Sequence, residues 1–252
     1  MILRELADAI ERGEAVASAV VVRTSRSVPR HAGSRMLVYG DGRTSGTIGG
    51  GEMEYRVRVE AASALEDGRP RLTTYSLVDP SEGDPGVCGG EVDIYVEPHM
   101  PASTMYVIGA GHVGKAVSDL AHWLGYRTVV WDDRDDIVAE IENADATVSG
   151  PLPEALEREP ITADTSVIMV TRNVPLDLEL LPTVIATPAR YIGLMGSERR
   201  WAKTRAKLVE GGASEADLER IHSPIGVEIN AETPEEIAVS ILAEVIGDRR
   251  AP

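Results

Sequence analysis

The sequence is short of several residue types, and two of these shortages exclude common kinds of site. Phenylalanine is absent, and a single cysteine occurs among 252 residues. One cysteine forms no disulfide within the chain and cannot build a cysteine-based zinc site. The five histidines are scattered without a pair at metal-ligand spacing, so a histidine-based metal site is not expected either.

Positive charge is also scarce. Lysine occurs three times, the other 22 of the 25 basic residues are arginine, and the net charge is -16. Such an acidic chain is not expected to bind nucleic acid or an anionic membrane surface. An acidic, lysine-poor surface is typical of adaptation to high salt, which screens like-charge repulsion. We therefore expect a halophilic protein; equal stability at low and high salt would remove this hypothesis.

Long apolar runs are missing as well. No run approaches the ~18 residues of a membrane span. The first residues, Met1–Asp8, are charged and amphipathic, unlike a signal peptide. We expect a cytoplasmic protein with no membrane partner, built as one large domain or two small ones.

One stretch carries the strongest structural signal. Residues 105–108 form an apolar run suited to a buried strand, and Gly109-Ala-Gly-His-Val-Gly114 follows directly. After a helical pattern, a second strand at 127–131 ends in Asp132 and Asp133. Strand, glycines, helix, strand and acid in this order predict a Rossmann-type dinucleotide-binding unit.

Each residue of the glycine turn has an expected role. Gly109 permits the tight turn, Gly111 lets the backbone approach a pyrophosphate, and Gly114 lets helix and strand pack closely. The N–H groups at the helix start would meet the phosphate charge. His112 lies inside the turn, where its ring could face a phosphate or a substrate, and Asp132 would accept hydrogen bonds from a ribose.

The wider pattern predicts two domains, 1–98 and 104–250, joined by a polar segment with two prolines. The fold class is α/β: a C-terminal Rossmann-like parallel sheet with a smaller N-terminal α+β domain. Further strands are expected at 15–24, 36–39, 71–77, 91–97, 146–148, 166–170 and 191–194, and helices at 3–12, 52–65, 176–185, 198–210 and 234–246.

A second glycine-rich stretch, Gly46-Thr-Ile-Gly-Gly-Gly51, precedes a predicted helix. Unobstructed N–H groups can wrap an anion there, helped by the helix dipole and by the hydroxyl of Thr47. The alternative is a tight strand-to-helix turn, with Glu52 and Glu54 as simple partners of the dipole. Because three adjacent glycines lose much conformational entropy on folding, a ligand is the favoured interpretation.

The cysteine, Cys88, lies between Val87 and Gly89-Gly90. A lone cysteine is usually a small buried hydrophobic residue. Here the glycines allow close backbone approach, and the polar loop upstream can leave the sulfur exposed. An accessible thiolate could bind a soft metal or carry sulfur. The local sequence favours neither the buried nor the accessible interpretation of Cys88.

Two basic segments are candidate anion sites. Ser197 precedes Arg199 and Arg200 at a predicted helix start, where basic residues oppose the helix dipole, so a negatively charged ligand is indicated. A second set lies in one polar loop that could grip a phosphate or simply be solvated. Its members are Arg26, Arg30, His31 and Arg35.

Together these motifs resemble the XdhC/CoxI family, the accessory proteins of xanthine dehydrogenase and carbon monoxide dehydrogenase. The resemblance extends from about Val20 to Ile246, in the family's order. It rests on Gly46–Glu54, on Val87–Gly90 before a strand ending in Glu97-Pro98, on Gly109–Gly114 with Asp132-Asp133, on Tyr191–Ser197, on Ser223–Val227 and on Thr233–Leu242.

The resemblance implies a chaperone for the molybdenum cofactor (molybdopterin) rather than an enzyme with turnover of its own. Such a protein binds the cofactor, supports addition of its terminal sulfido ligand and inserts it into the apo-enzyme of a molybdenum hydroxylase. A cysteine desulfurase is an expected partner, and Cys88 is expected to contact molybdenum or relay sulfur. The implied cofactor face comprises Thr47, Gly49, Gly50, Gly51, Cys88, Gly89 and Gly90. The implied nucleotide or phosphate face comprises Gly109, Gly111, His112 and Gly114, with Asp132 and Ser197 as further contacts.

The chain departs from the family at two places. Many relatives have a histidine-rich stretch where this chain reads Thr171–Asp177 without histidine, so Arg172 and Asn173 could bind an anion there instead. Glu52 stands where some members have cysteine, which leaves Cys88 without a second thiol.

Two further expectations stand beside this interpretation. The alternative function is an NAD(P)-dependent oxidoreductase that uses the Rossmann half. The sequence has no evident Tyr-x-x-x-Lys proton relay for such an enzyme, and this function leaves the N-terminal glycine motifs unexplained. A homodimer is expected because a small N-terminal domain would need a partner to cover a sheet face.

Overall fold

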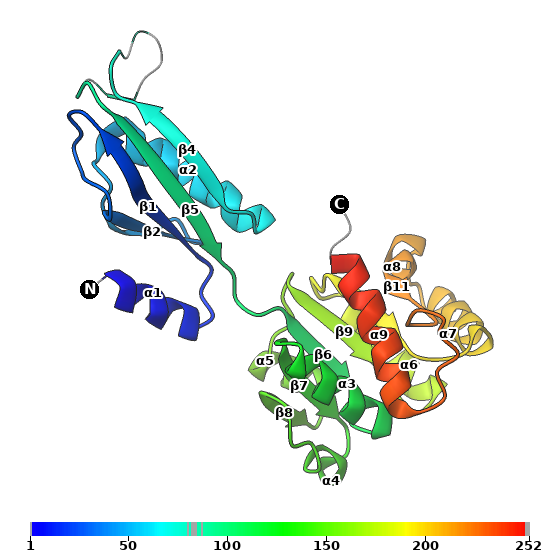
Figure 1. The fold of residues 1–252 in the computed structure, drawn as a ribbon. Coiled ribbons are helices and arrows are strands. Elements are labelled where there is room, and N and C mark those ends of the chain that lie inside the picture. Colours follow the sequence, from blue (N-terminus) through cyan, green and yellow to red (C-terminus); the bar gives the residue numbers. More distant parts are fainter. Residues whose placement is uncertain (1, 80, 82–84, 87, 250–252) are drawn as a thin grey trace. The chain divides into compact units, whose positions relative to one another are not determined.

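The structure, a computed structural model, describes residues 2–79, 81, 85–86 and 88–249. The chain divides into two compact units, Met1–Pro101 and Ala102–Pro252 (Figure 1). Each unit has its own sheet and its own hydrophobic core.

The N-terminal unit is built on an antiparallel sheet with the strand order β3-β2-β1-β5-β4. Alternating residues of β1 give the sheet its two faces. Ala17, Ala19 and Val21 pack into the core under α2, whereas Val16 joins a small cluster with Ala9 of α1. The elements are α1 (Ile2–Glu11), β1 (Val16–Ser25), β2 (Arg35–Tyr39), β3 (Thr44–Gly46), α2 (Gly51–Asp67), β4 (Arg71–Ser76) and β5 (Glu91–His99).

Strand pairing brings three loops to one end of this sheet. Ser25, the last residue of β1, pairs with Glu91, and Glu91 pairs with Ser76 at the end of β4. Strand β2 begins and β3 ends toward the same end. The segments 26–34 and 47–50 therefore leave the sheet at the same end as residues 77–79 and 88–90. Val87 of the cysteine motif lies outside the described residues.

The C-terminal unit is a parallel sheet with the strand order β11-β10-β9-β6-β7-β8. Helices α3 (His112–Trp123), α4 (Asp135–Val138) and α9 (Pro234–Arg249) cover one face. Helices α5 (Leu152–Arg158), α6 (Val174–Ile185), α7 (Glu198–Glu210) and α8 (Glu215–Glu219) cover the other. The strands are β6 (Thr104–Ile108), β7 (Arg127–Asp132), β8 (Ala146–Ser149), β9 (Thr165–Met169), β10 (Tyr191–Leu194) and β11 (Ile221–His222).

The order of these strands contains one reversal. The chain runs outward from β6 to β7 and β8, then returns to β9 on the other side of β6. In doubly wound sheets, ligands bind beyond the carboxyl ends of the strands at such a switch point. Gly109 follows β6, Asp133 follows β7 and Thr171 follows β9. The three residues therefore lie near one another, beyond the carboxyl ends of these strands.

The α/β fold expected from the sequence is confirmed, including the parallel Rossmann unit and the smaller N-terminal sheet. The sequence patterns miss the short elements β3, α4, α5, α8 and β11. No strand is predicted at Thr44–Gly46, whereas these residues pair with β2. A strand of three residues is too short to show alternation.

Among the described residues, no helix combines the length and the apolar character needed to cross a bilayer.

Candidate functional site

The first candidate site lies at the loop end of the N-terminal sheet, where the Gly46–Gly51 stretch encloses an anion of the chain itself. Glu54 Oε1 accepts hydrogen bonds from the N–H of Gly50 at 2.7 Å and of Ile48 at 3.3 Å. It also accepts one from the hydroxyl of Thr47. The sequence interprets Glu54 as a simple dipole partner, whereas its carboxylate organises the whole loop.

The charge of Glu54 is stabilised by these donors. Burial alone would raise the pKa of the carboxyl, but the Thr47 hydroxyl and the N–H groups of the loop outweigh it and hold the pKa below its usual range. The loop therefore keeps its shape through an ionised glutamate at neutral pH. Beyond that inner side, Gly50 and Gly51 remain open: a Cβ built on either would meet no atom within 4 Å.

The two glycine motifs of this unit pack against the same short segment, residues 25–29. A Cβ on Gly49 would lie 2.8 Å from the Cγ of Pro29, and a Cβ on Gly90 would lie 2.4 Å from the carbonyl oxygen of Ser25. Real Cβ contacts are longer, so both positions exclude any larger residue. The glycines that the sequence predicts to face a ligand thus also allow three loops to meet.

Cys88 is a free, exposed thiol beside this junction. Its turn is held by two backbone hydrogen bonds, from Gly89 N to the Leu77 carbonyl at 2.7 Å and from Leu77 N to the Gly90 carbonyl at 2.9 Å. Gly89 has a φ of 81°, which a side chain would strain. The interpretation of Cys88 as a buried hydrophobic residue is therefore wrong, and the exposed alternative holds.

The neighbouring loop adds positive charge. Arg26 and Arg30 are exposed and make no ion pair with any other residue that the structure describes. Arg35 instead turns inward, and its guanidinium donates to the Ser18 hydroxyl at 3.3 Å. The junction thus presents one thiol, open glycine backbone and two guanidinium groups.

The second candidate site is the Rossmann crevice of the C-terminal unit. Gly109 has a φ of 116°, and a Cβ there would lie 2.8 Å from the Val170 carbonyl oxygen. A Cβ on Gly114 would lie 1.8 Å from the Gly109 carbonyl oxygen, so helix α3 can start this close to β6 only with glycine. At Gly111 a Cβ would meet no atom within 4 Å, which leaves the space that a ligand would use.

Asp132 stabilises this crevice through hydrogen bonds within the chain. Its Oδ2 accepts the N–H of Ala110 at 2.8 Å and the Nη2 of Arg134 at 3.0 Å, and its Oδ1 accepts the Nε of Arg134 at 2.8 Å. The residue is 2% exposed. Both oxygens predicted to meet a ribose are therefore already engaged by the chain.

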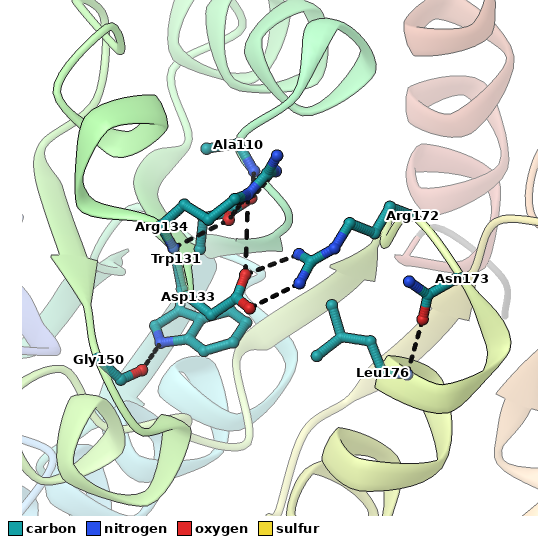
Figure 2. Close-up of polar contacts among 9 residues, drawn as sticks. Ala110, Trp131, Asp133, Arg134, Gly150, Arg172, Asn173 and Leu176 are labelled. Carbon is teal, nitrogen blue, oxygen red and sulfur yellow. Dashed lines mark hydrogen bonds and ion pairs between the residues drawn. The ribbon is translucent and has the colours of Figure 1, made fainter.

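Asp133 instead lies at the surface of the crevice and faces Arg172 (Figure 2). Two hydrogen bonds of 2.7 Å join Asp133 Oδ1 and Oδ2 to the two terminal nitrogens of Arg172. The Arg172 guanidinium is the main cause that lowers the pKa of Asp133 to about 2. The anion that the sequence predicts for Arg172 is thus a carboxylate of the same chain. Asn173 caps α6 by accepting the Leu176 N–H at 3.0 Å.

A buried ion pair fixes the loop that carries Arg172. Arg200 donates to the fully buried Asp177 through Nη2 at 2.7 Å and to the Thr171 carbonyl oxygen at 3.1 Å. Gly196 leaves room for it, because a Cβ there would lie 2.8 Å from the Arg200 Cδ. The basic helix start that hints at an anionic ligand therefore meets Asp177. Ser197 is the N-cap of α7, and its hydroxyl accepts the Arg200 N–H at 3.2 Å.

The predicted site residues of the C-terminal unit line two different cavities. Gly109, Gly111, Asp132 and Asp133 line a cavity of about 70 Å³ at the switch point. His112 lines another groove, of about 430 Å³, between α3 and α9. Ligand pockets usually measure about 300–1,000 Å³, so the crevice as it stands is too small for a nucleotide.

Fold and sites together define a class: a two-unit α/β protein with a Rossmann-type crevice and a separate glycine-rich junction that exposes one thiol. Within that class, residues 105–245 match the family model of the XdhC Rossmann domain, and residues 9–76 match that of the XdhC and CoxI family. The chain belongs to the XdhC and CoxI family.

The chain is similar to several known proteins. It is 35% identical over 252 residues to uncharacterized protein YqeB of Escherichia coli K12, covering 97% of this chain and 46% of YqeB. It is 25% identical over 287 residues to molybdenum cofactor insertion chaperone PaoD of the same organism, covering 98% of this chain and 88% of PaoD. It is also 26% identical over 160 residues to a probable xanthine dehydrogenase subunit of Bacillus subtilis, covering 63% of this chain and 46% of that protein. The chain thus spans about half the length of two of these relatives.

A solved structure shows the same fold. The crystal structure of a xanthine dehydrogenase from Bacillus halodurans superposes with a TM-score of 0.53 at 20% identity, covering 98% of this chain and 95% of the other. At this identity the likeness concerns the fold alone.

Proposed function

We infer that this chain binds the molybdenum cofactor as cargo and delivers it to the apo-form of a molybdenum hydroxylase. The observation that carries this proposal is the junction at residues 25–29, where both glycine motifs meet beside the exposed thiol of Cys88. Family membership and the similarity to PaoD, a molybdenum cofactor insertion chaperone, along nearly all of the chain support it.

The residues at the junction suit such a cargo. The cofactor brings its metal within an organic ligand that carries a phosphate, so the protein needs few further groups. A thiolate such as that of Cys88 is a ligand for a soft metal centre. Arg26 and Arg30 can pair with a phosphate. The open backbone of Gly50, Gly51 and Gly89 lets a large planar group approach without meeting side chains.

Support for sulfuration is a finer part of the same proposal. Cys88 would either contact the metal directly or carry sulfur supplied by a cysteine desulfurase. The two roles predict different results for Cys88→Ser. Loss of a metal contact lowers the affinity for the cofactor, whereas loss of a sulfur carrier leaves the affinity unchanged and lowers the fraction of sulfurated, active hydroxylase.

The test is reconstitution with purified components. The full chain, loaded with molybdenum cofactor, is mixed with an apo-hydroxylase of the xanthine dehydrogenase type, and hydroxylase activity is followed. We expect activation that depends on the chain and falls with Cys88→Ala or Arg30→Ala. Arg69→Ala is the matched control, because Arg69 is an exposed arginine at the opposite end of the same unit. Activation by free cofactor that the chain does not improve would contradict the proposal.

The same preparation tests the remaining expectations. Turnover of a metabolite with NAD(P)H by the chain alone would indicate the oxidoreductase instead. Light scattering on the purified chain tests the proposed homodimer.

A further inference from the structure

Helices α3 and α9 lie side by side on one face of the C-terminal sheet and leave a groove between them (Figure 1). They run in the same direction, because their first residues, His112 and Pro234, line the same groove. Near their last turns, the Arg249 guanidinium lies 5.1 Å from the ring centroid of Tyr126. The groove has a volume of about 430 Å³, so it has room for side chains of another molecule.

An apolar stripe follows this groove and continues beyond it. Ala116 and Leu120 contribute to the groove from α3, and Ala238 and Val239 contribute from α9. Trp123 follows Leu120 by three positions, so it extends the same side of α3 toward the end of the helix. Trp123 is 79% exposed and Val239 is 52% exposed. Tryptophan is enriched among the residues that anchor protein interfaces, so this stripe indicates a contact surface.

The α9 side of the groove is acidic. Residues 223–248 include six carboxylates and no lysine or arginine. Glu235 lines the groove, and Glu232 is exposed two residues before the helix. Among the residues that the structure describes, neither of these carboxylates takes part in an ion pair. On the α3 side, the Lys115 amine donates to the Glu140 carbonyl at 3.4 Å. The groove thus combines apolar walls with unpaired negative charge.

We propose that this groove docks a basic amphipathic helix of the hydroxylase that receives the cofactor, an inference that rests on the proposed delivery function. The apolar side of such a helix fills the space between α3 and α9 and covers Trp123. Lysine or arginine side chains on its flank pair with Glu232 and Glu235. From His112 to Trp123, α3 rises by about 17 Å, so a partner helix of about three turns spans the surface.

Charge distinguishes this occupant from two others. A second copy of the chain would bring two acidic walls together, and the net charge of -16 on each copy opposes that contact. An anionic membrane surface is repelled for the same reason. A basic helix gains from both features of the groove, because its apolar side chains leave water and its cations meet unpaired carboxylates.

Three substitutions test the surface at residues outside the candidate cofactor sites. Trp123→Ser and Val239→Ser remove exposed apolar contacts and should weaken binding of the apo-hydroxylase about tenfold and about threefold, respectively. Glu235→Lys places a cation against the basic flank and should weaken binding about fivefold or more. Val209→Ser is the matched control, because Val209 is a 43% exposed valine on α7, on the opposite face of the sheet.

The experiment measures docking and delivery separately on the full chain. Biolayer interferometry with an immobilised apo-hydroxylase of the xanthine dehydrogenase type gives the affinity of each variant at about 0.15 M KCl, where charges still act across about 8 Å. Activation of the same hydroxylase by the cofactor-loaded chain is followed over a range of hydroxylase concentrations. We expect the three variants to raise the half-saturating concentration and to leave the saturating rate and the affinity for the cofactor unchanged. Thermal unfolding is recorded for every variant.

The outcomes separate the docking surface from the delivery function. Unchanged hydroxylase affinity in stably folded Trp123→Ser and Val239→Ser chains overturns the docking surface, while activation by the parent chain keeps the delivery function. Weakened binding in these variants, without activation by the parent chain, overturns delivery and keeps the docking surface. No binding by the parent chain overturns the docking surface, and activation then decides the delivery function.

Two further measurements identify the other occupants. A dimer of the purified chain that Trp123→Ser dissociates would assign the groove to a second copy. Binding to phosphatidylcholine vesicles that Trp123→Ser abolishes would assign it to a lipid surface. Either result overturns the proposal.

Discussion

Arg200 and Asp177 form an ion pair in which the carboxylate is fully buried and the Nη2–Oδ2 distance is 2.7 Å. The same guanidinium donates to the carbonyl and the hydroxyl of Thr171. The pair therefore holds the loop after β9 to the start of α7, and this loop carries Arg172.

Removal of either partner should destabilise the C-terminal unit. Arg200→Met leaves the Asp177 carboxylate buried without its partner, and we expect a loss of about 3 kcal/mol in the free energy of unfolding. Denaturant unfolding followed by circular dichroism measures it. Arg205→Ala is the control on the same helix, because its pair with Glu215 is exposed and should contribute less than about 1 kcal/mol. Equal losses of unfolding free energy in the two variants would show that the buried pair stabilises the unit no more than an exposed pair does.

Glu54 predicts a dependence of stability on pH. The folded state lowers the pKa of this carboxyl, so the ionised form is favoured by folding. A lowered carboxyl pKa adds stability that is complete above the unfolded value of about 4.3 and is lost as pH falls through the folded value. Glu54→Gln should therefore be less stable than the parent chain at neutral pH, by about 1–3 kcal/mol. The difference should shrink below the usual glutamate range.

Glu52→Gln is the matched control for that series. Glu52 lies in the same first turn of α2, has a side chain that is 52% exposed, and has Arg56 as its one ion-pair partner among the residues that the structure describes. Its replacement should change stability by less than about 0.5 kcal/mol at any pH. If the difference in stability between the parent chain and Glu54→Gln did not change with pH, the loss would come from the altered loop geometry and not from the charge of Glu54.

Salt should stabilise this chain. A net charge of -16 repels itself in the compact state, and added ions screen that repulsion. We expect the thermal midpoint to rise between about 0.05 and 1 M KCl, where the Debye length falls from above 10 Å to about 3 Å. Differential scanning calorimetry across this range measures the effect. A midpoint that does not move would remove the hypothesis of a halophilic protein.

The sequence predicts what depends on local order and misses what depends on distant pairs. The strand, glycine turn, helix and strand around Gly109–Gly114 are consecutive, so their pattern alone indicates a Rossmann unit. The start of the last helix is also local: Thr233 stands directly before Pro234, and its hydroxyl accepts the Glu236 N–H at 3.3 Å. In contrast, Asp133 and Arg172 are 39 positions apart, and no periodicity shows that they meet.

The same limit explains the candidate anion sites. Basic side chains and bare N–H groups indicate a negative partner, but the sequence does not tell whether that partner is a ligand or another residue. Glu54 fills this role for the Gly46–Gly51 loop, and Asp177 fills it for Arg200. A glutamate placed one turn into the helix after the glycines is the signal that could have revealed the first case.

Gly111 and Gly114 offer a direct test that separates ligand space from packing. Gly111 has a φ of -68°, which any residue adopts, and open space where a Cβ would stand. Gly111→Val should therefore fold, with at most about 1 kcal/mol lost at the helix N-cap, while its side chain fills the path of a diphosphate. A Cβ on Gly114 would overlap the Gly109 carbonyl oxygen at 1.8 Å, so Gly114→Ala should lose about 3 kcal/mol or more of stability. Thermal unfolding and nucleotide titration of both variants are needed, because the prediction is a contrast: one folds and does not bind, the other is damaged in folding. Normal binding by a folded Gly111→Val chain would mean that the ligand does not approach the backbone at this turn.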